Sequence, residues 1–112
     1  MPRSVPRTYS RIAREAVLLL GQLIRAARTE RKLSAQEVAE RAGISRGLLR
    51  RIENGGMKCE IGAAFEVAVI VGVPLFDDDP KTPARHLRHT REKLALLPQS
   101  VRKERKPVDD DF

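Results

Sequence analysis

The sequence predicts an all-α protein: a compact five-helix domain with one added C-terminal helix and flexible tails. Aromatic residues are scarce, with one Tyr, three Phe and no Trp in 112 residues. A β-sandwich would use more aromatic and β-branched side chains than this chain contains. Apolar residues instead recur at helical spacing between Ser, Gly and Pro signals. We expect a basic mobile arm at residues 1–9, the domain at 10–80, the added helix at 81–98 and a disordered charged tail at 99–112.

The first predicted helix is capped by Ser10 and runs to about Lys32. Its apolar face is predicted from spacing to contain Leu19, Leu20, Leu23, Ile24 and Ala27. Gly21 weakens a helix by ~1 kcal/mol relative to Ala. An alternative start near Leu18, preceded by a separate short helix, therefore stays open.

Two short helices follow. Ser34 and Glu37 have the spacing of a capping box, which predicts a helix over 35–41. Gly43 ends that helix with positive φ, and Ser45 caps the next one, over 46–53. The sequence Asn54-Gly55-Gly56 stops it.

The last elements are predicted from the same signals. A helix from about Glu60 to Val71 is closed by Gly72, and a short element covers 73–76. Thr82-Pro83 has the form of a helix start, and this helix extends to Leu97. Its thin apolar stripe leaves three roles open: completing the core, forming a dimer, or binding a partner.

The charge balance points to a polyanionic partner. Lys and Arg number 22 against 15 Asp and Glu, which gives a net charge of +7. The single Cys59 excludes an internal disulfide framework and a Cys-based zinc cage, and it fits a reducing cytoplasm. No apolar run reaches the ~18 residues of a membrane span, and no secretory signal is visible, so we expect no membrane association.

The pair of helices joined by Gly43-Ile44-Ser45 forms a helix-turn-helix signature. Leu49 and Ile52 share one side of the second helix and pin it to the core. At 100° per residue, the opposite side carries Gly47, Arg50 and Arg51, and Arg46 lies at the exposed first turn, so four residues face outward. Three guanidinium groups on one exposed face suit a DNA major groove lined with guanine acceptors and phosphates.

These residues resemble the phage-repressor and Cro-type helix-turn-helix family, often called the XRE family. The resemblance covers Leu20 to Phe76 and rests on the joint spacing of Arg28, Leu33-Ser34, Ala39, Gly43, Ser45, Ile52-Glu53 and Gly55. It implies a lambda-repressor-like domain that dimerises on palindromic double-stranded DNA, as a protein of the bacterial cytoplasm and nucleoid. It also implies that Arg46, Gly47 and Arg51 occupy base-reading positions and that Arg28 pairs with Glu53.

Two positions depart from the family pattern. The family usually has Gln at the first position of the second helix, where it contacts phosphate. Here Ala35 occupies that position and Gln36 follows it. Gly47 replaces a side chain that usually reads a base, so base readout is expected to rest on Arg46 and Arg51. The residues expected to contact phosphates are Gln36, Ser45, Arg50 and Lys58.

The overall layout also resembles HipB-type antitoxins, which are dimeric repressors that bind a HipA-type kinase toxin. The tail ends in Asp109, Asp110, Asp111 and Phe112, a candidate anchor for such a partner. A merely solubilising tail is the competing interpretation. We therefore expect a repressor and antitoxin. The alternative is a stand-alone phage-type or restriction-modification-type regulator without a toxin partner.

Catalysis and cofactors are not expected. No nucleophile is paired with a base, and no phosphate-binding loop is present. His86 and His89 lie one turn apart, but no further ligand stands at a suitable local spacing to complete a metal site. Arg3 and Arg7 could enter a minor groove, although a disordered arm explains them more simply.

Overall fold

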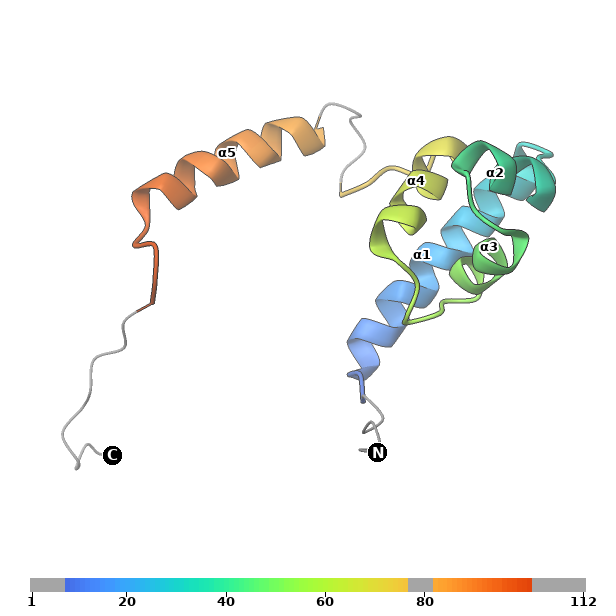
Figure 1. The fold of residues 1–112 in the computed structure, drawn as a ribbon, viewed down its shortest axis with the longest axis horizontal. Coiled ribbons are helices and arrows are strands. Elements are labelled where there is room, and N and C mark those ends of the chain that lie inside the picture. The colour runs from blue at the N-terminus through green and yellow to red at the C-terminus, as the bar shows by residue number, and fades with distance from the viewer. Residues whose placement is uncertain (1–7, 77–81, 102–112) are drawn as a thin grey trace.

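The computed structural model describes residues 8–76 and 82–101 of the chain. Within these ranges it contains five α-helices and no strand, which confirms the all-α fold. The helices are α1 (Arg11–Glu30), α2 (Ala35–Ala42), α3 (Arg46–Glu53), α4 (Ile61–Val71) and α5 (Thr82–Leu96). Helices α1 to α4 pack around one core, and α5 lies apart from them (Figure 1). Residues 1–7 of the predicted arm, residues 77–81 and the tail from 102 onward lie outside the described residues.

The three predicted serine N-caps are present. The Ser10 hydroxyl accepts from the backbone N–H of Ala13 at 3.1 Å, and Ser45 caps α3 in the same way. Ser34 and Glu37 form the full capping box: the Ser34 hydroxyl accepts from the Glu37 N–H at 3.1 Å, and the Glu37 carboxylate accepts from the Ser34 N–H at 2.8 Å. Hydrogen bonds from Ser34 hold the pKa of the Glu37 carboxyl below its ordinary value. The stabilisation from this ionised cap is therefore complete above the ordinary pKa and is lost as the pH falls through the lowered one.

The alternative start of α1 near Leu18 is wrong, since the helix is continuous from Arg11. Gly21 has a steric role in this helix. It is buried where α1 crosses the end of α3, and an added Cβ would lie 2.8 Å from the carbonyl oxygen of Glu53. The glycine lets two helices approach each other at a distance that any larger residue would prevent.

The core is formed by one apolar face from each of the four helices and by Val73. Its buried members are Ile24, Val38, Ala39, Leu49, Ile52, Val67, Ala68, Val71 and Val73. Leu19 and Leu23, which the spacing places on the apolar face of α1, are 56% and 47% exposed. They lie about 140° and about 100° around the helix from Ile24, which points at the core.

The predicted short element at 73–76 is not helical. The chain leaves α4 through Gly72, at φ 84°, and the N–H of Val73 closes the helix end by donating to the carbonyl of Ala68 at 2.8 Å. Pro74 then offers no N–H, and Phe76 has a φ of 70°. Among the described residues up to 76, the helical body, formed by α1 to α4, therefore has four helices rather than the five expected.

Helix α5 starts where Thr82-Pro83 predicts and ends one residue before the predicted limit. Every side chain from Ala84 to Leu96 is exposed. Helix α5 therefore does not complete the core of the body, which removes one of the three roles left open by the sequence. Its apolar side chains, including Leu87 and Leu94, do not pack against the described residues of α1 to α4.

The close crossing at Gly21 determines whether Gly21→Ala stabilises or destabilises the protein. Helix propensity alone favours Gly→Ala inside a helix by about 1 kcal/mol. We expect Gly21→Ala instead to destabilise the protein by about 1–3 kcal/mol, because the added methyl meets two backbone carbonyls of α3 that cannot move independently. Urea denaturation measures this difference.

Gly62→Ala is the matched control. An added Cβ at Gly62 in α4 meets nothing within 4 Å. This variant should be as stable as the wild type or up to about 1 kcal/mol more stable. Equal stabilisation by both substitutions would contradict the close crossing of α1 and α3.

Candidate nucleic-acid interface

The turn between α2 and α3 is fixed at both ends. Gly43 adopts φ 71°, a left-handed conformation that costs a glycine little, and thereby ends α2. The N–H of Ile44 donates to the carbonyl of Ala39 at 3.0 Å, and the Ile44 side chain packs against the core. Ser45 then caps α3. This short turn sets the angle between the two helices, so α3 is held as a rigid unit.

Helix α3 separates its residues into a buried and an exposed side, as its spacing predicts. Leu49 and Ile52 are 1% and 4% exposed and anchor the helix to the core. The four residues expected outside are all exposed: Arg46, Gly47, Arg50 and Arg51. The outward side of this helix is therefore basic along its whole length.

A buried ion pair joins α1 to the end of α3. The guanidinium of Arg28 binds both carboxylate oxygens of Glu53, with Nε to Oε2 at 2.6 Å and Nη2 to Oε1 at 3.1 Å. The side chains are only 16% and 7% exposed. The hydrogen bond that Arg28 donates to Glu53 raises the pKa of Arg28 above its ordinary value, with burial acting in the opposite direction. This is the pair that the family resemblance implies.

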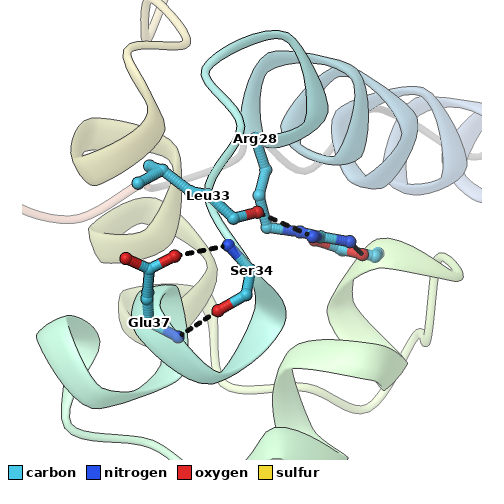
Figure 2. A network of polar contacts seen from close by, with 5 residues as sticks. Arg28, Leu33, Ser34 and Glu37 are labelled. Atoms are coloured by element: carbon cyan, nitrogen blue, oxygen red, sulfur yellow. Dashed lines mark hydrogen bonds and ion pairs between the residues drawn. The ribbon is translucent and has the colours of Figure 1, made fainter.

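Arg28 also reaches the connection between α1 and α2. Its Nη1 donates to the carbonyl of Leu33 at 3.0 Å. Figure 2 shows this contact beside the capping box of Ser34 and Glu37. One guanidinium thus holds the end of α1, the start of α2 and the end of α3 in a fixed arrangement.

A notch of about 590 Å³ opens between α1 and α3. Its lining includes Arg25 and Arg28 of α1, Ala35 of α2, and Arg46, Arg50 and Glu53 of α3. Arg46, expected to read bases, therefore lies beside Arg50 in this notch. Arg51 is not part of the lining, but it lies next to it: Gly47 lines the notch, and a Cβ added at Gly47 would be 3.7 Å from Nη1 of Arg51.

Three further residues are expected to contact phosphates: Gln36, Ser45 and Lys58. Lys58 is exposed in the loop between α3 and α4. The Ser45 hydroxyl accepts from the N–H of Leu48, which leaves its own O–H to donate. Gln36 donates to Glu40 within α2 at 2.6 Å, and its second amide hydrogen is free of that bond. The tail residues Asp109–Phe112 lie outside the described part of the chain.

Sequence reasoning missed one residue of this face. Arg25 is not among the residues that the sequence predicts for this face, although it precedes Arg28 by three residues and so lies on the same side of α1. That spacing was the available signal. The structure places it in the wall of the notch, opposite the basic side of α3.

Comparison with known proteins agrees with this geometry. Residues 19–74, half of the chain, match the family model of the helix-turn-helix domain. The chain therefore belongs to the helix-turn-helix domain family and is a DNA-binding protein of that class. No curated protein and no solved structure matches the chain. In the ranges 8–76 and 82–101, no helix is both long and apolar enough to cross a membrane.

The buried pair predicts a large effect from a single substitution. Arg28→Ala leaves the carboxylate of Glu53 without its partner in a site that is 7% exposed. Breaking a buried pair from one side costs ~3–5 kcal/mol. We expect a loss of this size in urea denaturation and a clearly lower Tm.

Arg31→Ala is the control, since Arg31 is an exposed arginine near the same end of α1. It should change the stability by less than ~1 kcal/mol. The double variant Arg28→Ala with Glu53→Ala should cost less than the two single variants together. Small and similar effects of Arg28→Ala and Arg31→Ala would mean that Glu53 is solvated.

Proposed function

We propose that the chain is an XRE-type transcriptional repressor that binds a palindromic operator as a homodimer. The observation that carries the proposal is the outward side of α3, where Arg46, Arg50 and Arg51 have no ion-pair or hydrogen-bond partner for their guanidinium groups among the described residues. Unpaired guanidinium groups on a rigid helix match guanine edges and phosphates. The protein would act by binding alone, without catalysis or a cofactor.

In this proposal α3 enters the major groove. Arg51 projects from the centre of the exposed side and can donate to O6 and N7 of one guanine with both arms of its guanidinium. Gly47 beside it leaves space for the edge of the groove. Phosphates on the two flanks are contacted by Arg50 and Ser45 on one side and by Lys58 on the other, with Gln36 at the start of α2. Repression follows because a bound dimer occupies the promoter and excludes polymerase.

An exposed apolar surface supports the homodimer. Leu23 and Phe76 are 47% and 82% exposed and line one shallow pocket with Ala27 and Val73. Leu19, one turn before Leu23, extends this surface along α1. Large apolar side chains gathered on one face are typical of an interface between proteins. A second copy of this chain would remove them from water.

The antitoxin role is the second candidate. It is supported by α5, whose Leu87 and Leu94 are 51% and 61% exposed and seven residues apart, on one face. A partner such as a HipA-type kinase could cover that face, and co-purification with such a kinase tests it. If the chain is instead a stand-alone regulator without a toxin partner, we expect the apolar face of α5 to contribute to the dimer interface.

A base contact by Arg51 can be distinguished from its contribution to sequence-independent binding by comparing two DNA duplexes. A binding site is first selected from a random duplex library with the wild-type chain. We expect Arg51→Ala to cost ~1–3 kcal/mol on the selected site and little on a random duplex, because a base contact exists only on the correct sequence. Titrations at several salt concentrations measure both.

Lys58→Ala is the contrasting variant. It should weaken binding to both duplexes about equally and lower the salt slope by ~1, since phosphates carry no sequence information. An equal loss on both duplexes for Arg51→Ala would exclude its base-reading role.

The dimer surface has a direct test. We expect Leu23→Glu to shift the chain toward the monomer in analytical ultracentrifugation, because a carboxylate would be buried in an apolar interface. Binding to the full palindrome should weaken, while binding to a half-site should not. Gln22→Glu adds the same charge at the neighbouring exposed position and should leave the mass unchanged. If Leu23→Glu also leaves the mass unchanged, this surface is not the interface.

A further inference from the structure

The notch between α1 and α3 is lined by more arginines than its one carboxylate can pair with. Arg28 is fully engaged, with Glu53 and with the carbonyl of Leu33. Arg25, Arg46 and Arg50 line the same notch and are exposed. None of these three guanidinium groups has a hydrogen bond or ion pair within the described residues. The one carboxylate of the lining is thus neutralised by Arg28, and three charges remain.

Unpaired arginines in a concave wall attract an anion with several oxygens. Each guanidinium presents its donors in a plane and can bind two phosphate oxygens at once. A concave surface lined by one sign of charge also strengthens the local potential. The volume of about 590 Å³ exceeds that of one phosphate and leaves room for the adjoining sugar. These features fit a segment of nucleic-acid backbone.

The two walls of the notch belong to different helices. Arg46 and Arg50 come from α3, four residues apart and so on one side of it, next to the side that carries Gly47 and Arg51. Arg25 comes from α1, which crosses α3 at Gly21. When α3 lies in a major groove, the backbone at the edge of that groove passes the side of α3 that faces α1. Arg25 then stands across that backbone from Arg50.

We propose that this notch binds a DNA backbone phosphate and that Arg25 of α1 is a DNA contact outside the helix-turn-helix. The inference rests on the proposed function, because it requires α3 to bind in the groove. It adds that α1 takes part in binding as well as supporting α3. Arg25 supplies affinity and fixes the register of α3 without reading sequence.

The test compares Arg25→Gln with Arg31→Gln. Both variants remove one exposed arginine, Arg25 within α1 and Arg31 at the C-cap of α1, and Arg31 lies beside Gly72 at the end of α4, away from the notch. Dissociation constants are measured from 50 to 200 mM salt on the selected duplex and on a random duplex. For Arg25→Gln we expect weaker binding by the same factor on both duplexes and a salt slope smaller by about 0.9. Its affinity should therefore fall about 3.5-fold less than that of the wild type across this range.

The controls separate the outcomes. Arg25→Lys should recover most of the slope, and all variants should keep the wild-type Tm because residue 25 is exposed. A slope for Arg25→Gln equal to that for Arg31→Gln would overturn the inference, as would a loss confined to the selected duplex. Saturable binding of inorganic phosphate, lost in Arg25→Gln with the DNA slope unchanged, would assign the notch to a free anion and also overturn it. If the wild type binds no DNA, the proposed function itself fails.

Discussion

The ion pair between Arg28 and Glu53 determines how the basic helix is presented. Glu53 is the only buried charged or polar side chain in the part of the chain that the structure describes. Glu53 is the last residue of α3, and the guanidinium that forms the ion pair with its carboxylate belongs to Arg28 of α1. A carboxylate without that partner could not stay in this site, since an unpaired buried charge is too costly. The rotation of α3 about its own axis is therefore tied to α1, and with it the direction in which Arg50 and Arg51 point.

This pair can form only because the two helices meet closely. Gly21 removes the side chain at the crossing, where an added Cβ would be 2.8 Å from the carbonyl oxygen of Glu53. Gly55, just after α3, has φ 77° and would place a Cβ 2.9 Å from Cα of Leu18. Backbone thus packs on backbone at two points of α1, both of which precede Arg28. Steric constraint sets the separation of the helices, and the ion pair sets their relative orientation.

Local signals in the sequence were sufficient for the five observed helices and for the turn between α2 and α3, although they also predicted a short element at 73–76 that is not helical. Ser34, Glu37 and Gly43 act through hydrogen bonds and backbone dihedrals within a few residues, so their roles follow from spacing alone. The exposure of Leu19 and Leu23 and the steric role of Gly21 did not follow from spacing, because the environment of α1 depends on how the other helices pack against it, which is a property of the tertiary structure. The notch could not be predicted from the sequence either, since its lining combines Arg25 of α1 with Arg50 of α3, and their proximity depends on how the two helices pack. The ion pair was predicted only through the family resemblance, because Arg28 and Glu53 are 25 residues apart.

The choice of a buried ion pair at this place has a physical consequence for binding. Burying two charges costs desolvation energy that their attraction largely offsets, so an apolar pair of similar size could give comparable stability. An apolar contact, however, tolerates small rotations, whereas two parallel hydrogen bonds between a planar guanidinium and a carboxylate do not. Recognition of bases requires side chains held to a fraction of an ångström, which favours the directional contact. The same pairing neutralises Arg28 and Glu53 together, so the arginines around them remain free to meet the charge of a nucleic acid.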